Sequence, residues 1–151
     1  MKMVTKINAA AAMTAVALAV AGPAVASSYY SASSPLNAYE DSHVQAQMFG
    51  SFSLENQAYL RNDTRHRDFK PGGDSAFERT EYRYDFSDSQ GFVYNTTDQS
   101  PKTTSSDWYY QYDHDGIPND ADAGRMLTQV CEDHGIYKDP CSVWPRQTFN
   151  F

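Results

Sequence analysis

Residues 79–86 read Arg-Thr-Glu-Tyr-Arg-Tyr-Asp-Phe, in which charged residues alternate with aromatic residues and a threonine. Thr80, Tyr82, Tyr84 and Phe86 fall on one side of an extended chain, and charged residues fall on the other. Successive side chains of a strand point to opposite faces, so a period of two indicates a strand with one buried face. The stretch therefore predicts a half-exposed strand of an antiparallel sheet.

The pattern extends in both directions from this strand. Downstream, the turn-like residues 87–91 lead to Phe92-Val93-Tyr94, so we expect a hairpin over residues 78–95. Upstream, the even positions from Val44 to Leu54 are mostly apolar and the odd positions mostly polar, which predicts another strand. Together these segments predict an antiparallel sheet from roughly residue 42 to residue 112.

In the C-terminal third of the chain, the spacing of the apolar residues changes from that of a strand to that of a helix. Residues that could form the buried face of a helix recur there with helical spacing: Met126, Leu127, Val130, Cys131 and His134. Gly135 would supply the helix stop. We therefore expect one helix near residues 122–134 and an irregular tail. The predicted fold class is α+β, with a small antiparallel sheet, one C-terminal helix, an irregular N-terminal arm and a C-terminal tail.

A candidate metal site precedes the expected helix. Residues 111–122 read Gln-Tyr-Asp-His-Asp-Gly-Ile-Pro-Asn-Asp-Ala-Asp. Numbered as a twelve-residue calcium loop, the stretch places Gln111, Asp113, Asp115, the Ile117 carbonyl, Asn119 and Asp122 at positions 1, 3, 5, 7, 9 and 12. Alternate side chains of such a loop converge on one hard cation, and the glycine at position 6 permits the sharp turn.

This stretch resembles the DxDxDG calcium loops of EF-hand-like and thrombospondin type 3 repeats. The resemblance covers twelve residues, and it implies Ca²⁺ as the bound ion. Gln111 stands where these loops carry Asp, and Asp122 is shorter than the Glu of EF-hands, so we expect a weak dissociation constant of roughly 0.1–1 mM. The alternative is an acidic turn that only caps the helix after it.

Cys131 and Cys141 are the only cysteines of the chain. In an exported protein two cysteines usually pair, so we expect a disulfide between them. The alternative is a metal or redox site. Nine intervening residues do not match the spacing of zinc ligands or of a thioredoxin-type pair.

The N-terminus reads as a signal peptide that ends at Ala26. Lys2 and Lys6 precede an apolar run over residues 7–21, and Ala24-Val25-Ala26 forms a small-x-small cleavage site. The run is shorter than the ~20 residues of a membrane-spanning helix. We therefore expect a periplasmic, cell-surface or extracellular protein with no transmembrane span after cleavage.

The exported part divides into two regions. The Ser-rich stretch over residues 27–41 contains Pro35 and has no period, so it predicts a flexible arm. Residues 42–151 then form a single small secreted domain. Eleven Tyr, eight Phe and two Trp are present in the chain. After the leader Leu and Ile are scarce, so aromatic rings must supply much of the buried area.

The net charge and the lack of catalytic motifs disfavour several classes of function. The formal net charge is −7 and no basic stripe is visible, which argues against a nucleic-acid partner. The sequence lacks HExxH, G-x-S-x-G and glycine-rich phosphate motifs, so an enzyme is disfavoured but stays open. We expect a non-enzymatic structural or accessory protein, stabilised by calcium and a disulfide. It would dock onto a larger assembly or onto its own copies.

A second function from another class also fits the sequence. The chain would then be a small secreted hydrolase or a glycan-binding module. Its stacking platform would consist of Trp108, Tyr109, Tyr110 and Tyr112. The same rings also suit the core of a strand, which is their more common use.

Overall fold

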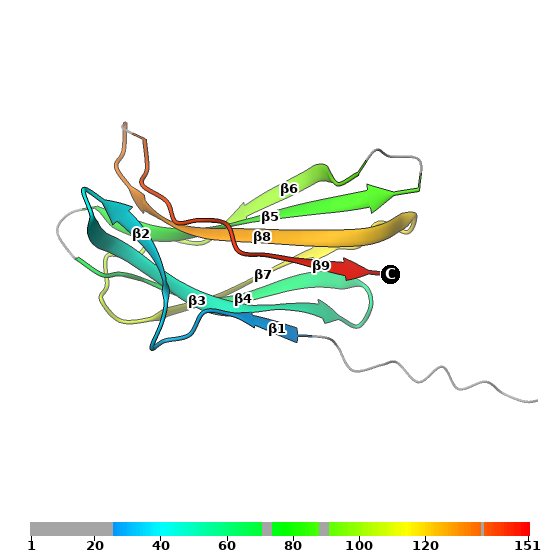
Figure 1. The fold of residues 1–151 in the computed structure, drawn as a ribbon, viewed down its shortest axis with the longest axis horizontal. Helices are drawn as coiled ribbons and strands as arrows, with labels where there is room; N and C mark the ends of the chain where they lie inside the picture. Colours follow the sequence, from blue (N-terminus) through cyan, green and yellow to red (C-terminus); the bar gives the residue numbers. More distant parts are fainter. Residues whose placement is uncertain (1–25, 71–73, 88–90, 137) are drawn as a thin grey trace, which may run out of the picture.

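The computed structural model describes residues 26–70, 74–87, 91–136 and 138–151, and these residues form a sandwich of two antiparallel sheets (Figure 1). The nine strands are β1 (Ala26–Tyr29), β2 (Leu36–Glu40), β3 (His43–Glu55), β4 (Tyr59–Asp68), β5 (Ser75–Phe86), β6 (Val93–Gln99), β7 (Tyr109–Gly116), β8 (Ala121–Asp133) and β9 (Arg146–Asn150). The predicted signal peptide lies outside the described residues, apart from Ala26.

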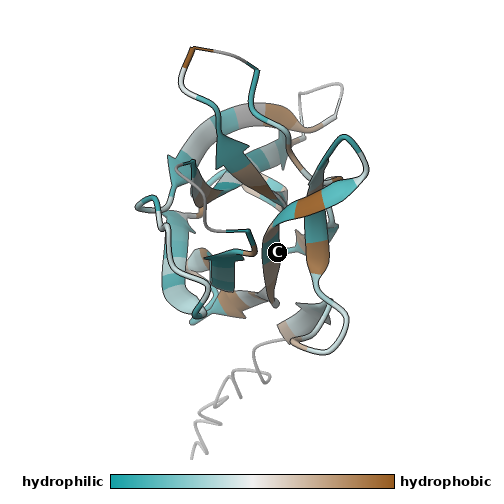
Figure 2. Ribbon diagram, turned by 90° about the vertical axis from the view of Figure 1, so that its left-hand side faces the viewer, coloured by the Kyte–Doolittle hydropathy of each residue, from teal (hydrophilic) through white to brown (hydrophobic). Residues whose placement is uncertain are grey.

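One sheet has five strands and the other has four. In the five-stranded sheet the order is β1-β3-β4-β7, and β2 also pairs with β3. Strand β3 is long enough to pair with β2 through its first half and with β1 through its second half. The four-stranded sheet has the order β6-β5-β8-β9. Viewed from the end, the two sheets curve around a shared interior (Figure 2).

The predicted α+β fold is wrong, because no helix occurs in the part of the chain that the structure describes. Residues 122–134, predicted as a helix, form most of β8. One face of this strand packs against the opposite sheet, and its edge pairs with the C-terminal segment through β9 and the Cys131–Cys141 bridge. Buried residues occur on both of its faces. Met126, Thr128 and Val130 point inward, while Cys131 faces the tail.

The two predicted strands around the quoted stretch are present as β3 and β5, and β6 completes the expected hairpin. Residues 27–41, predicted as a flexible arm, carry β1 and β2, which both pair with β3. The tail after residue 134, predicted as irregular, contains β9. The described residues include no helix of the length and hydrophobicity that crossing a membrane requires.

The interior is apolar on one side and polar on the other. Phe52, Leu60, Tyr84, Met126 and Val130 belong to a cluster of buried apolar side chains. Toward the edge formed by β6 and β7, the buried side chains are instead polar or charged. They include Asn62, Thr64, His66, Glu78, Thr80, Ser100 and Asp113. This polar half of the sandwich contains Asp113, one of the six metal ligands predicted from the sequence.

Candidate functional site

The six predicted calcium ligands do not surround one point. Gln111, Asp113 and Asp115 are alternate residues of β7 and share its inner face. Residues two apart in a strand are separated by about 6.6–6.8 Å, so these side chains stand in a row. Ile117 packs against the core, Asn119 is exposed in the connection to β8, and Asp122 is exposed at the start of β8. Calcium binding by this segment stays a prediction.

The row on β7 faces the four-stranded sheet. Asp115 is held there, because Tyr84 Oη and Asn95 Nδ2 each donate a hydrogen bond of 2.8 Å to its Oδ2. Asp113 accepts a 2.9 Å bond from Gln111 Nε2 through Oδ1. Its other oxygen, Oδ2, is buried and has no hydrogen-bond partner among the described residues. A buried acceptor without a partner is costly, so Asp113 requires an explanation.

Glu78 on β5 also has a buried carboxylate oxygen without a hydrogen-bond partner among the described residues. Its side chain is fully buried. Oε1 accepts hydrogen bonds from Thr80 Oγ1, from Thr128 Oγ1 at 2.8 Å and from Asn62 Nδ2 at 3.1 Å. Oε2 has no partner among the described residues. Burial, followed by the negative charge of Asp113, raises the pKa of Glu78 well above its ordinary value.

We call Glu78, Asp98, Asp113 and Asp115 the interior carboxylate group. Asp98 lies on β6, opposite Thr80 of β5, and shares the inner face of that sheet. A cavity of about 550 Å³ opens at the β6–β7 edge and is lined by Asp98, Gln111 and Asp113, among others. Burial and the charges of Asp113 and Asp115 raise the pKa of Asp98. Sequence reasoning missed Glu78 and Asp98 as parts of this site, although the alternation through Thr80 and Tyr82 places Glu78 on the inner face.

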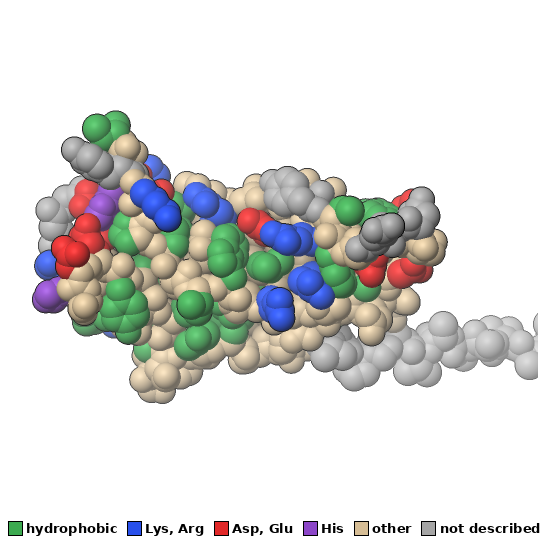
Figure 3. Space-filling model, turned by 45° about the horizontal axis from the view of Figure 1, so that its top comes forward, with side chains coloured by type: hydrophobic (Ala, Val, Ile, Leu, Met, Phe, Trp, Pro, Cys, Tyr) green, Lys and Arg blue, Asp and Glu red, His purple; other side chains and the backbone are tan. Residues whose placement is uncertain are grey.

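A second group of metal-ligand type lies at the C-terminal end of β8. Glu40 ends β2, Glu132 lies near the end of β8 and His134 follows it. His134 Nε2 is 3.3 Å from Glu132 Oε2, and its Nδ1 is 3.5 Å from Glu40 Oε1. One ligand atom of each residue lies within 4.8 Å of the others, so this end group could hold a metal ion. Acidic and histidine side chains gather at that end of the molecule (Figure 3).

The donor atoms of the end group indicate its chemistry. An imidazole nitrogen with carboxylates suits first-row transition ions, whereas calcium takes oxygen ligands only. The same arrangement also favours a proton on His134. Burial opposes that charge, but the Glu132 hydrogen bond and the charge of Glu40 raise the pKa of His134. Burial in turn raises the pKa of Glu132.

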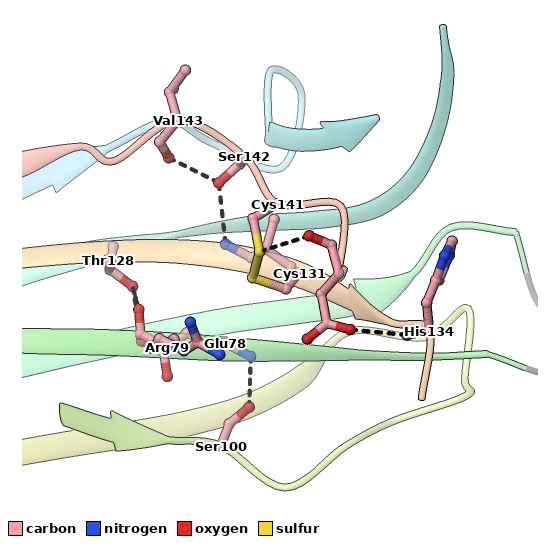
Figure 4. Close-up of a disulfide and its surroundings, with 11 residues drawn as sticks. Glu78, Arg79, Ser100, Thr128, Cys131, His134, Cys141, Ser142 and Val143 are labelled. Atoms are coloured by element: carbon pink, nitrogen blue, oxygen red, sulfur yellow. Dashed lines mark hydrogen bonds between the residues drawn. A yellow bond between two sulfur atoms is a disulfide. The ribbon is translucent and has the colours of Figure 1, made fainter. Parts of the chain in front are cut away.

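The predicted disulfide is present between Cys131 and Cys141, beside this end group (Figure 4). It joins β8 to the tail, and three backbone contacts flank it. Ser142 N donates to the Val130 carbonyl at 2.9 Å, Glu132 N donates to the Pro140 carbonyl at 3.0 Å, and Val130 N donates to Ser142 Oγ at 3.1 Å. Structural disulfides of this kind form in oxidising compartments, which agrees with an exported protein.

The outer face of the five-stranded sheet carries a regular set of arginines and aromatic rings. Its arginines come from alternate positions of β4 and lie against rings from neighbouring strands or segments. The arginine–aromatic face consists of Phe49, Arg61, Arg65, Arg67, Trp108, Tyr110 and Tyr112. Arg67 lies 4.3 Å from the centroid of the Trp108 ring, and Arg61 lies 4.7 Å from that of Tyr112. The predicted stacking platform is thus outside the core, except that Tyr109 lies on the inner side of β7.

One buried pair resembles catalytic chemistry but lies where substrate has no access. Ser100 Oγ is 3.3 Å from His66 Nε2, the arrangement of a nucleophile beside a base. Both side chains are buried, and His66 Nδ1 has no partner among the described residues. Burial lowers the pKa of His66 to about 4. The pair therefore belongs to the hydrogen-bond network of the interior, where Ser100 Oγ also accepts a hydrogen bond from Glu78 N.

A scan of the chain against models of protein families finds no match, and searches of curated proteins and of solved structures find no significant match either.

Proposed function

We propose that this chain is an exported accessory protein without catalytic activity, which docks onto an acidic surface of a protein partner through the arginine–aromatic face. The observation that carries the proposal is the set of exposed rings and guanidinium groups on one sheet face. Tyr110 and Tyr112 are 47% and 50% exposed. Tyr, Trp and Arg are the residues that most often dominate the binding energy of protein interfaces.

Charge complementarity favours an acidic partner. The chain has a net charge of −7, yet Arg61, Arg65 and Arg67 occupy one outer face. Arg61 is neutralised by Asp63 at 2.8 Å. Arg65 is exposed and forms no salt bridge among the described residues. Its guanidinium lies 5.3 Å from the Tyr110 ring and 5.8 Å from the Phe49 ring, and its charge also acts on Asp63. Its guanidinium remains able to bind a carboxylate in two-point geometry.

The same contacts disfavour a glycan-binding platform, the alternative that the sequence leaves open. A sugar stacks on the face of an aromatic ring, so that face must be free. The Tyr112 ring has Arg61 over it, and the nearly parallel His114 ring lies 6.1 Å away. Trp108 is likewise faced by Arg67. Each of these rings therefore has a face that is already in contact with a charged side chain, which leaves less ring surface for a sugar.

Two further parts of the proposal concern stability and location. The Cys131–Cys141 disulfide supports export into an oxidising compartment. We keep calcium as the structural ion of the mature domain. Its support is the set of acidic side chains on the inner side of β7, because carboxylate oxygens are the ligands that calcium prefers.

Photo-cross-linking in the native cells tests the docking face. A photoreactive phenylalanine analogue at Tyr110 should give one dominant cross-linked protein, joined through an acidic segment that mass spectrometry identifies. Arg65→Glu should reduce its yield at least tenfold, and raising the salt concentration during purification should release the partner. The same analogue at Thr148, exposed on the outer side of the four-stranded sheet, is the control and should give no such product.

Two outcomes would contradict the docking proposal. One is equal cross-linking from Tyr110 and Thr148. The other is specific retention of the purified protein on a polysaccharide that Arg65→Glu leaves unchanged, which would favour the glycan-binding function instead.

A further inference from the structure

Three carboxylates surround one imidazole ring at the C-terminal end of β8. Glu132 Oε2 and Asp74 Oδ2 lie 3.3 Å and 3.8 Å from His134 Nε2, and Glu40 Oε1 lies 3.5 Å from His134 Nδ1. Among the described residues, no lysine or arginine forms a salt bridge with any of these carboxylates. Because one protonated imidazole can balance only one of three negative charges, the group favours a further cation.

Glu132 is the buried member of this group. It continues the inward row of Thr128 and Val130 on β8, and it is 5% exposed. Its hydrogen-bond partner, His134 Nε2, is itself a member of the group. A buried carboxylate is costly unless a positive group or a metal ion compensates its charge. The burial of Glu132 therefore places the demand for a cation at the centre of the group.

The backbone that carries Glu132 and His134 is held in place without any ion. Glu132 N donates to the Pro140 carbonyl at 3.0 Å, and His134 N donates to Asp139 Oδ1 at 3.0 Å. The Cys131–Cys141 disulfide closes the same segment, and His134 lies just beyond the end of β8 within it (Figure 4). The two ligand side chains thus start from a backbone that is already ordered, which favours metal binding.

The third ligand comes from the other sheet. Glu40 ends β2 of the five-stranded sheet, whereas β8 belongs to the four-stranded sheet. Gln45 Nε2 donates a 3.4 Å hydrogen bond to Glu40 Oε2, and Oε1 is the oxygen near His134. The side chains of Glu40 and His134 are 44% and 15% exposed. Solvent therefore reaches the group, and an ion bound there would connect the two sheets.

The spacing of the donor atoms fits a small ion. One donor atom from each of Glu40, Glu132 and His134 lies within 4.8 Å of the other two. Zinc holds nitrogen and oxygen ligands at about 2.0–2.2 Å, so neighbouring ligands of a tetrahedral site are about 3.3–3.6 Å apart. Rotation of the partly exposed Glu40 side chain is enough to reach this geometry. The mixed nitrogen and oxygen donors favour a first-row transition ion over calcium.

We propose that Glu40, Glu132 and His134 form a binding site for a divalent first-row transition ion of the zinc class, which cross-links β2 and β8 beside the disulfide. Three protein ligands leave a fourth position for water. The site shares no residue with the acidic row of β7 or with the arginine–aromatic face. It therefore depends on neither the calcium part nor the docking part of the proposed function.

Zinc titration of the purified protein with its disulfide intact tests this site, by calorimetry and by competition with a fluorescent zinc chelator. Wild-type protein should bind one zinc ion per chain, and excess calcium should not displace it. His134→Gln should weaken zinc binding by about two orders of magnitude, and Glu40→Gln by about tenfold. Zinc should raise the melting temperature of wild type and leave that of His134→Gln unchanged.

Two matched controls should bind zinc as wild type does. His114→Gln removes an exposed histidine of β7. Glu55→Gln removes a carboxylate that ends β3 and is 39% exposed, close to the exposure of Glu40. Glu132→Gln removes the buried ligand and should abolish zinc binding. Circular dichroism checks its fold, and if this variant is unfolded, Glu40→Gln decides the outcome.

Three results would overturn the proposal. Absence of saturable zinc binding by wild type would mean that a proton on His134 neutralises the group instead. Unchanged affinity in both His134→Gln and Glu40→Gln would place the ion elsewhere. Equal weakening by His114→Gln and His134→Gln would indicate scattered binding to surface histidines.

Discussion

Gly50 is the residue at which strand β3 is most crowded. A Cβ atom there would lie 2.1 Å from the Asp63 carbonyl oxygen and 2.5 Å from the Tyr29 hydroxyl. Tyr29 cannot simply move away, because its hydroxyl donates a 2.9 Å hydrogen bond to the buried Asn62. The glycine thus lets the Tyr29 ring of β1 reach the hydrogen-bond network of the interior.

Gly50→Ala should therefore destabilise the domain. Overcrowding of a packed position costs about 1–3 kcal/mol, and here one of the clashing atoms belongs to the backbone. Urea unfolding measures the loss. Gly116→Ala is the control, since its nearest neighbour would be Tyr59 Cε1 at 3.9 Å, an ordinary contact, and its effect should stay within about 0.5 kcal/mol. Equal stability of Gly50→Ala and wild type would contradict this account of the close approach.

Sequence reasoning at the residue scale reached only part of the interior carboxylate group. Asp113 and Asp115 stood out because acidic residues alternate before Gly116. Glu78 shares the period of Thr80 and Tyr82, which places it inside, but a glutamate in an alternating strand is normally assigned to the exposed face. Only the paired sheets show that its partners include residues of β4 and β8.

At the scale of elements, β5 and β8 show when periodicity is reliable. The outer residues of β5 in the quoted stretch are charged, so its alternation is visible in the sequence. Strand β8 has Thr128 inside and Cys131 under the tail, and both are fully buried. Because the inward-facing Thr128 is polar and the outward-facing Cys131 is of a type that is usually buried, the apolar residues of β8 do not alternate with a period of two. Their spacing in the sequence instead resembles that of a helix. The C-terminal segment that pairs along the edge of β8 is not visible in the sequence pattern near this strand.

The Cys131–Cys141 disulfide between β8 and the tail predicts that the free energy of unfolding depends on redox conditions. Reduction, or the double change Cys131→Ala with Cys141→Ala, opens a loop whose ends are ten residues apart. On the chain-entropy model this loop contributes about 3 kcal/mol to the free energy of unfolding. Urea unfolding with and without reductant should show that loss in wild type. The double variant serves as the control, since reductant should not affect it further; an unchanged wild-type midpoint on reduction would refute the stabilising role.

At the scale of the whole molecule, the polar half of the interior should make stability depend on acid pH. Burial lowers the pKa of His66 to about 4, against 6.5 in the unfolded chain. Between these values the unfolded state binds a proton and the folded state does not. The contribution of His66 is therefore fully present above pH 6.5 and is lost as pH falls toward 4. Its size is on the order of 3 kcal/mol.

Comparison of His66→Gln with wild type isolates this contribution. The variant should lose less stability than wild type between pH 6.5 and pH 4, measured by urea unfolding at each pH, because glutamine does not titrate. His43→Gln, at an exposed position, is the matched control for the exchange of an imidazole for an amide. Parallel curves for wild type and His66→Gln would mean that the buried imidazole is protonated in the folded state as well.

The cross-link between Cys131 and Cys141 also determines how the domain carries tension at its C-terminal end. Only ten residues, 142–151, lie beyond the disulfide. A pull on Phe151 would peel β9 away from β8, but the chain can release at most about 35 Å of slack before the covalent bond becomes taut. Load then passes to β8, an inner strand of its sheet. A tether at this end would extend by the length of one short segment and then hold.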